Sequence, residues 1–445
     1  MYKFVPPDTG EITGKVEIER KHLEELRDRL KTFGDVEKEL NQVDFKRLAT
    51  TALLETVLAG AISTRASDVH FEAEEKRAKV RFRIDGLLHD IFGKIPLRNY
   101  GSLVSRIKLL SGMKINVYGE PQDGRFTITL GGKEIEMRVS VIPSEFGETI
   151  VMRVLDPGAT AVDLRDLGLR EDDLAIVERN LAKPNGLILN TGPTGSGKTT
   201  TLYAFLRKLN DPESKVITIE DPIEYRIEGI EQTQVDPGAN YTFARGLRAI
   251  VRQDPDVILV GEIRDLETAD IAMQAALTGH LVLSTLHTND AVGAVPRLVN
   301  LGVKPSTIGP ALSLVIAQRL VRKLCGACRK ETKQTPDIRE KVKKFLASLP
   351  SKVDRAKYPL GKLYKPVGCP ECNGFGYRGR VGVFEFLESG PRFEELVLKE
   401  ASEVALKRIA KEQEMVTMQE DGVLKALLGL TDLEEVERVT GALAW

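Results

Sequence analysis

Long apolar runs are missing from this 445-residue sequence, in which 18 apolar residues nowhere follow one another. A helix that spans a membrane needs about 20 such residues. The first residues, MYKFVPPDTGEITGK, also lack the basic flank and the apolar stretch of a secretory signal. The sequence therefore predicts a protein that is neither secreted nor membrane-spanning.

An excess of either charge is missing too, since 64 basic residues stand against 65 acidic ones and the formal net charge is −1. No overall field would hold such a chain on nucleic acid or on an anionic bilayer, so a contact of that kind requires a local patch. Apolar residues make up 42% and charged residues 29%, which is typical of a folded protein and excludes overall disorder. The length predicts two or three domains.

Cysteine is scarce, and all four cysteines fall into two C-x-x-C pairs about 40 residues apart: Cys325 with Cys328, and Cys369 with Cys372. In a chain predicted to be cytosolic, such pairs indicate metal binding rather than disulfides. Four thiolates close a tetrahedral Zn²⁺ site without an open position, which is a structural role. Chance pairing of small buried cysteines and a redox disulfide are the alternatives.

The first third of the chain contains two segments that differ in composition and in the spacing of their apolar residues. Residues 12–62 are rich in Glu, Lys, Leu and Arg, with Leu23, Leu26 and Leu30 at helical spacing, and predict two helices. Residues 68–155 show short alternating runs separated by turn signals such as Gly131-Gly132, and predict a strand-rich domain with a helix near Tyr100–Met113. The expected strands include Lys79–Ile84, Arg125–Leu130 and Ile135–Val141.

After a Pro/Gly/Asp-containing stretch around residues 157–169, apolar strands alternate with helical segments. This alternation predicts an α/β fold, in which helices cover both faces of a mainly parallel sheet. The tail after Val383 is expected to be helical. The expected strands are Gly186–Asn190, Val216–Glu220, Val257–Val260 and Leu281–Thr285.

The first of these strands leads into a glycine-rich loop with the pattern G-x-x-x-x-G-K-T, and a helix follows it. Glycines let the backbone curl so that successive N–H groups point at phosphate oxygens, and the positive end of the helix dipole adds to them. This pattern predicts an ATP site in which Lys198 bridges the β- and γ-phosphates and the Thr199 hydroxyl binds Mg²⁺. The predicted ATP-binding residues are Gly192, Pro193, Thr194, Gly195, Ser196, Gly197, Lys198, Thr199 and Thr200.

Acidic residues close the next two strands. Glu220, Asp221 and Glu224 follow one strand, and Glu262 follows the run Asp256–Val260. Ligands of such folds sit at the carboxyl ends of the strands, so these acids are expected near the phosphates. Any one of them could instead be a helix N-cap.

A fourth segment, Thr278–Asp290, is strand-like and has a histidine at each end, His280 and His287. These histidines could sense the γ-phosphate or link it to a neighbouring subunit. A lone histidine is more often structural.

Together, the segments GPTGSGKTT, ITIEDPIEY, PDVILVGEIRD and TGHLVLSTLHTNDA resemble the Walker A loop, Asp box, Walker B strand and His box of the type II secretion and type IV pilus assembly ATPase family. The resemblance implies a RecA-like ATPase domain preceded by a smaller PAS-like N2 domain, and a ring of six subunits. The predicted parts are an N-terminal helical segment 1–46, the N2 domain 47–156, a linker 157–170, and an ATPase domain 171–445 with a zinc-binding insertion 322–376 and a C-terminal helical region.

The same resemblance implies roles for single residues. Glu224 is similar to the general base that orients the attacking water, Glu262 to the acid that acts on Mg²⁺ directly or through its water, and His280 and His287 to the His-box pair. Three arginines of the N2-like region, Arg125, Arg138 and Arg153, lie in segments similar to those whose arginines reach the nucleotide. A guanidinium suits that task because it grips two phosphate oxygens at once. Without the family, each arginine reads as an exposed strand residue.

Within the family, the four cysteines are typical of the secretion and pilus-extension branch. Arg319, Arg322, Lys323, Arg329 and Lys330 make the first cysteine pair basic. Such a run is usually a solvated face, and the alternative is a docking site for an inner-membrane platform protein or for anionic lipid headgroups. The resemblance implies a cytoplasmic homohexamer, peripherally associated with the inner membrane.

Three functions remain open from the sequence. The first is a motor that hydrolyses ATP with Mg²⁺ to drive secretion, pilus assembly or DNA uptake, with Zn²⁺ as a structural metal. The second is a RecA-like motor on nucleic acid, which the neutral charge and the lack of a basic stripe with aromatics disfavour. The third is a scaffold that binds ATP without turnover.

Overall fold

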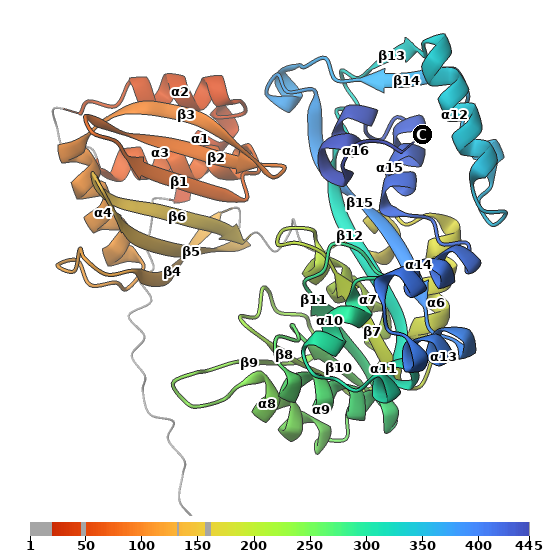
Figure 1. The fold of residues 1–445 in the computed structure, drawn as a ribbon. Coiled ribbons are helices and arrows are strands. Elements are labelled where there is room, and N and C mark those ends of the chain that lie inside the picture. Colours follow the sequence, from red (N-terminus) through yellow and green to blue (C-terminus); the bar gives the residue numbers. More distant parts are fainter. Residues whose placement is uncertain (1–19, 46–49, 131–132, 156–161, 445) are drawn as a thin grey trace, which may run out of the picture. The chain divides into compact units, whose positions relative to one another are not determined.

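The computed structural model describes residues 20–45, 50–130, 133–155 and 162–444. The chain forms two compact units, Met1–Ala159 and Thr160–Trp445, which are described separately below (Figure 1). The expected features at residues 12–19, at the Gly131-Gly132 turn and at residues 157–161 of the linker lie outside the described residues.

The first unit is built on a six-stranded sheet in which every pair of neighbours is antiparallel, in the order β3-β2-β1-β6-β5-β4. Buried and more exposed residues alternate along β2 and β4, so one face of the sheet forms the core and the other carries polar side chains. The strands are β1 (Asp68–Ala73), β2 (Arg77–Ile84), β3 (Leu87–Pro96), β4 (Gln122–Leu130), β5 (Lys133–Ser144) and β6 (Gly147–Leu155).

The described residues of the first unit form four helices: α1 (Arg20–Arg29), α2 (Phe33–Asn41), α3 (Thr50–Ser63) and α4 (Leu97–Leu110). Leu23 and Leu26 of α1 and Leu30, directly after it, are buried in the same core as the sheet, as are Val36 and Leu40 of α2. The helical spacing of the three leucines is thus explained by burial. The core continues across the predicted boundary between residues 46 and 47.

The second unit contains a seven-stranded sheet in the order β15-β12-β7-β11-β10-β8-β9. All neighbours are parallel except β12 and β15, which pair antiparallel. The strands are β7 (Gly186–Thr191), β8 (Val216–Glu220), β9 (Glu231–Gln234), β10 (Val257–Val260), β11 (Leu281–Leu286), β12 (Leu312–Leu324) and β15 (Tyr377–Glu388). The four strands expected from the sequence are confirmed, and β9, β12 and β15 were not predicted.

Helices cover both faces of this sheet, as predicted, and form a core on each. Leu187 and Leu189 of β7 face one core and Ile188 faces the other, since successive strand residues point to opposite faces. On the Ile188 side lie α6 (Glu171–Leu181) and α7 (Lys198–Leu209) with the short 3₁₀ helix η1 (Leu164–Leu167). On the other side lie α8 (Phe243–Val251), α9 (Leu266–Leu277), α10 (Ala294–Asn300), α11 (Pro305–Ala311), α13 (Pro391–Lys399) and α14 (Glu403–Glu412).

Between β12 and β15 the chain makes an excursion that contains β13 (Lys330–Lys333), α12 (Pro336–Ser348) and β14 (Lys362–Lys365). It packs on α15 (Met418–Leu427) and α16 (Leu433–Thr440) in a core of its own. The expectation of a helical tail after Val383 is wrong for its first residues. The strand β15 continues to Glu388 because it pairs with β12 along almost its whole length.

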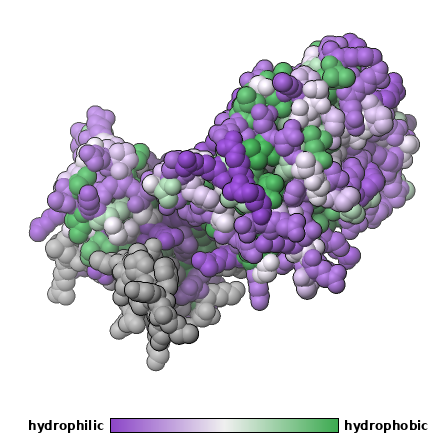
Figure 2. All heavy atoms as spheres, turned by 90° about the horizontal axis from the view of Figure 1, so that it is seen from below, coloured by the Kyte–Doolittle hydropathy of each residue, from purple (hydrophilic) through white to green (hydrophobic). Residues whose placement is uncertain are grey.

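Hydrophilic side chains cover most of the surface seen in Figure 2, and the hydrophobic ones on it form small groups. Across the parts of the chain that the structure describes, none of the helices has both the length and the apolar character needed to cross a bilayer.

Three buried charged residues connect α6, β15 and α15. Asp421 of α15 lies 2.9 Å from the guanidinium of Arg170, accepts a hydrogen bond from Lys425, and also accepts the Phe384 N–H of β15 at 2.9 Å. The side chains of all three charged residues are at most 7% exposed. Asp421 is thus the carboxylate that Lys425 contacts, and it shares Arg170 with Asp172 (3.0 Å) and Asp173 (2.6 Å).

We predict that Asp421→Ala lowers the free energy of unfolding by roughly 3–5 kcal/mol, because it leaves Lys425 buried without the carboxylate that it contacts, whereas Arg170 keeps Asp172 and Asp173. Denaturant titration measures this change. Glu403→Ala is the matched control, because Glu403 and Lys407 form an exposed pair with the same four-residue spacing in α14. A loss as small for Asp421→Ala as for the control would contradict the account.

Candidate nucleotide-binding site

The parallel strands of the second unit end at a common edge of the sheet. The residues of this unit predicted to bind or hydrolyse the nucleotide follow those strand ends, except for His280. The loop Gly192–Gly197 follows β7, Glu224 follows β8, Glu262 follows β10 and His287 follows β11. In open α/β sheets, this carboxyl edge is where ligands bind.

The glycines of the loop are required by the backbone and by close packing. Gly192, Gly195 and Gly197 have φ angles of 150°, 78° and 89°, which side chains disfavour. A Cβ atom at Gly192 would lie 2.4 Å from the backbone carbonyl oxygen of Gln318 in β12. A Cβ atom at Gly197 would lie 2.8 Å from the side-chain amide nitrogen of Gln318. The loop thus rests directly on β12.

Lys198 begins α7 and turns back over the loop. Its ammonium group donates to the carbonyl oxygens of Gly192 (2.8 Å) and Pro193 (3.1 Å). Burial lowers the pKa of Lys198, and the negative charge of Glu262 opposes that shift. Thr199 follows in the first turn of α7 and is exposed. A cation and a hydroxyl thus lie at the positive end of a helix, next to a curled loop.

Glu262 and His287 come together at the ends of β10 and β11. The Nε2 atom of His287 lies 3.6 Å from one carboxylate oxygen of Glu262, and Arg264 donates to the other. Arg264 also lies 3.8 Å from Asp221, which follows β8. The Glu262 side chain is 16% exposed, so solvent can still reach it. These groups form a charged row across three neighbouring strand ends.

Glu220 and Glu224 have different surroundings although only three residues separate them. Glu220 is 4% exposed and accepts hydrogen bonds from Tyr203, Thr218 and Gln232. Burial raises its pKa, while these hydrogen bonds oppose the shift. Glu224 is only half-buried and lies in the loop beyond the strand. Glu220 therefore has a structural position and Glu224 an accessible one.

His280 is the exception. It precedes β11, and its Nδ1 atom lies 3.0 Å from the carbonyl oxygen of Ala275 in α9. The six residues of β11 span roughly 20 Å, at about 3.3 Å per residue. The structure therefore places His280 at the opposite edge of the sheet and does not bring it together with His287.

The predicted arginines of the first unit form one row on the polar face of its sheet. Arg125 of β4 is paired with Arg138 of β5, Arg138 with Arg153 of β6, and Arg153 with Asp68 of β1. Arg153 donates to Asp68 at 3.2 Å. Arg138 donates to Glu136 at 3.2 Å, so acidic neighbours offset part of the positive charge of the row.

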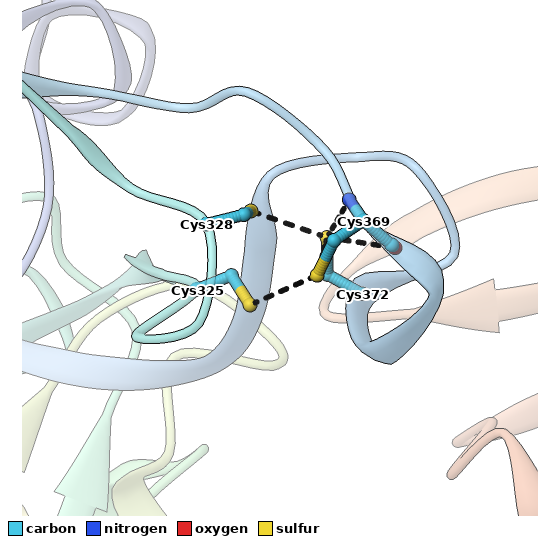
Figure 3. Close-up of side chains that lie close together, drawn as sticks. All are labelled: Cys325, Cys328, Cys369 and Cys372. Atoms are coloured by element: carbon cyan, nitrogen blue, oxygen red, sulfur yellow. Dashed lines mark hydrogen bonds between the residues drawn. The ribbon is translucent and has the colours of Figure 1, made fainter.

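The four cysteines converge at the base of the excursion between β12 and β15 (Figure 3). Their sulfur atoms lie within 4.8 Å of one another, and three of the pairs are 3.7–3.9 Å apart. Four sulfurs at about 2.3 Å from a common Zn²⁺ would be roughly 3.8 Å apart, whereas a disulfide needs about 2.05 Å. The arrangement thus fits a metal and excludes the disulfide alternative in this state.

Backbone groups favour a thiolate at Cys372, whereas burial raises the pKa of Cys325 and Cys328. Although burial raises the pKa of Cys372, hydrogen bonds from the N–H groups of Cys369 and Gly376 outweigh it and lower the pKa to about 7. A thiolate is the form of cysteine that binds metal.

The basic run near the first cysteine pair is partly structural. Arg322 pairs with Glu435 of α16 at 2.7 Å and lies over the Tyr377 ring, and Arg319 donates to the Val439 carbonyl oxygen at 2.8 Å. Arg329 donates to the Gly429 carbonyl oxygen. These three arginines hold the C-terminal helices on β12, which leaves less of the run for docking.

Three residues of the site were missed by the sequence reasoning. Gln318 accepts hydrogen bonds from Asn190 (3.0 Å) and Thr201 (2.8 Å) and supports the loop from β12. Tyr203 bonds the buried Glu220, and Arg264 bonds Glu262. Only Arg264 could have been inferred from the sequence, because it stands two residues after Glu262. Gln318 and Tyr203 reach the site through contacts between distant segments.

A phosphate loop after a buried strand, with carboxylates at the neighbouring strand ends, defines the chain as a P-loop ATPase. The family model described as "Type II/IV secretion system protein" matches residues 44–438. The chain belongs to this family of secretion ATPases.

Two relatives illustrate the match. The "Type II secretion system ATPase E" of Vibrio cholerae serotype O1 is 48% identical over 389 residues, which cover 87% of this chain and 75% of the relative. The "Type IV pilus assembly ATPase PilB" of Myxococcus xanthus is 40% identical over 428 residues, which cover 96% and 72%.

Solved structures have a similar fold. The pilus retraction motor PilT with bound ADP has a TM-score of 0.57 at 27% identity, covering 86% of this chain and 95% of that one. The ATPase DotB of Legionella pneumophila has a TM-score of 0.62 at 24% identity, covering 86% and 94%.

We predict that Gly192→Ala weakens ATP binding about tenfold or more. The added methyl group meets a backbone oxygen that cannot move aside, and such local strain amounts to roughly 1–3 kcal/mol. Gly195→Ala is the control, because its φ is also positive but nothing lies within 4 Å of the added Cβ. Fluorescent-nucleotide titration compares the two, and equal losses would argue against the contact with β12.

Proposed function

We propose that this chain is a motor ATPase that works as a homohexamer at the cytoplasmic side of the inner membrane and drives assembly of a type II secretion pseudopilus or a type IV pilus. One observation carries the proposal: the phosphate loop, Glu262, Glu224 and His287 lie at one edge of a sheet, in a chain 40–48% identical to ATPases named for these machines. The second unit acts as the RecA-like ATPase domain and the first as the PAS-like N2 domain.

In this proposal, ATP supplies the phosphoryl group and Mg²⁺ neutralises the charge that develops on it. Lys198 and the backbone N–H groups of residues 192–200, apart from Pro193, would hold the phosphates. Thr199 and Glu262 would hold Mg²⁺, Glu262 directly or through water. Glu224 is the general base that orients the attacking water. His287 lies 3.6 Å from Glu262, and its proposed role is to sense the γ-phosphate.

Arg125, Arg138 and Arg153 complete the nucleotide site in the assembled ring. The support is their row across β4, β5 and β6 on the polar face of the sheet, because each guanidinium can grip two phosphate oxygens. His280 lies at the far edge of its own sheet, so its proposed role is a contact with a neighbouring subunit rather than with the phosphates of its own chain.

The proposed partner surface for the inner-membrane platform protein and anionic lipid headgroups is the basic insertion, residues 329–365. It contains 12 Lys and Arg but only 4 Asp and Glu, in a chain whose net charge is −1. A hollow on its surface is lined by Gln334, Pro336, Arg339, Glu340, Lys343 and Leu360, so two cations there stand beside one carboxylate. A patch of this charge attracts acidic lipids, and salt screens that attraction.

A structural Zn²⁺ held by Cys325, Cys328, Cys369 and Cys372 would join β12 to β15 at the base of this insertion. The support is the spacing of the four sulfurs and the N–H groups directed at them.

We predict that Glu224→Gln binds ATP normally but hydrolyses it at least about 100-fold more slowly, because the amide cannot accept the proton of the attacking water. Phosphate release and fluorescent-nucleotide binding are measured on the same preparation. Glu228→Gln, an exposed acid of the same loop, is the control. Unchanged turnover of the Glu224 variant would remove Glu224 from the chemistry.

We predict about one zinc per chain by elemental mass spectrometry, and loss of that zinc with a lower unfolding midpoint in Cys372→Ser. Gly326→Ala is the control, because it lies in the first cysteine pair yet nothing is within 4 Å of its added Cβ. Purified protein without metal, and with an unfolding midpoint unaffected by chelator, would contradict the zinc site.

A further inference from the structure

The segment that carries Glu224, residues 221–230, contains no helix or strand. Side chains from neighbouring elements hold its backbone instead. Gln232 of β9 accepts the Ile227 N–H at 2.8 Å and donates to the Tyr225 carbonyl oxygen at 3.2 Å. The position of Glu224 therefore depends on residues that lie outside the segment.

Tyr203 of α7 contacts the backbone of Glu224. Its hydroxyl oxygen accepts the Glu224 N–H at 3.4 Å, and its proton is donated to the Glu220 carboxylate. A phenol has one proton to donate and lone pairs left to accept. The acceptor Glu220 thus orients the hydroxyl so that a lone pair remains for Glu224.

Aromatic packing fixes the next residue to the same helix. The Tyr225 ring stands edge-on to the Tyr203 ring, with centroids 4.6 Å apart. Arg207, one turn further along α7, donates to the Tyr225 hydroxyl at 2.8 Å. Residues 224 and 225 are therefore both attached to α7.

The same helix begins with Lys198, five residues before Tyr203. We propose that Tyr203 is a positioning residue for Glu224: with its hydroxyl fixed by Glu220, it holds the Glu224 backbone at a set distance from the phosphate-binding end of α7. This inference rests on the proposed role of Glu224 as general base. Tyr203 is fully buried and acts only through the loop.

Tyr203→Phe tests the inference because it removes only the hydroxyl. We expect kcat for ATP hydrolysis to fall about tenfold, since small misplacements of a reacting group have effects of this size or larger, while the affinity for ATP and the KM stay unchanged. Thr218→Val is the matched control. It removes the hydrogen bond that the Thr218 hydroxyl donates to Glu220 at 2.6 Å, but it leaves the hydrogen bond between the Glu224 N–H and Tyr203 in place. Unchanged kcat in Tyr203→Phe, or an equal loss in the control, overturns the proposal.

The double variant separates this inference from the role of Glu224 itself. Because Tyr203 acts through Glu224, Tyr203→Phe should change the residual turnover of Glu224→Gln less than about twofold, whereas independent effects would multiply. If Glu224→Gln alone is fully active, the proposed base is wrong. If Glu224→Gln is slow and Tyr203→Phe is not, only the positioning role fails.

Thermal unfolding shows whether each variant is folded. If Tyr203→Phe does not fold, Glu220→Gln tests the same step, because it replaces the charged acceptor that orients the hydroxyl. A lower kcat with unchanged ATP affinity supports the proposal, and wild-type kcat overturns it.

Discussion

Parallel pairing of β7, β11, β10 and β8 is the constraint on which the site depends. The register places Val260 of β10 beside Ile219 of β8 and Ser284 of β11, so these strands end together. The groups that follow those ends are far apart in sequence, yet they meet at one edge. His280, at the amino end of β11, is excluded by the same geometry.

Buried polar residues then support the groups that must stay accessible. Gln318 lies beneath the phosphate loop, and Glu220 lies behind the loop that carries Glu224. Such buried groups are costly unless every partner is in place, so they favour a single arrangement of the backbone around them. The exposed residues of the site therefore need not fix their own positions.

The sequence was most informative where function depends on contiguous residues. The phosphate loop, the acids after the apolar strands and the two cysteine pairs could be recognised from the sequence, because each is defined by local spacing. The strands β12 and β15 were missed because they become recognisable only when they pair with each other. Gln318 and Tyr203 were missed because their partners are distant in the sequence. Gln318 bonds Thr201 and Asn190, which are 117 and 128 residues away, and Tyr203 bonds Glu220, which is 17 residues away.

Charge was the least reliable guide. The run around Arg322 suggested either a solvated face or a docking surface, whereas the structure uses Arg319, Arg322 and Arg329 to hold the C-terminal helices. The excess positive charge of residues 329–365 can be counted in the sequence. Only the structure shows that these residues form one unit, which packs on α15 and α16.

The central claim is that this chain hydrolyses ATP with the residues that follow β7, β8, β10 and β11. Steady-state phosphate release with Mg²⁺ and ATP, compared between the wild-type chain and Lys198→Ala, tests it most directly. The account predicts turnover by the wild type that is abolished in the variant. Binding of ATP by the wild type without phosphate release, or equal release by both proteins, would contradict it.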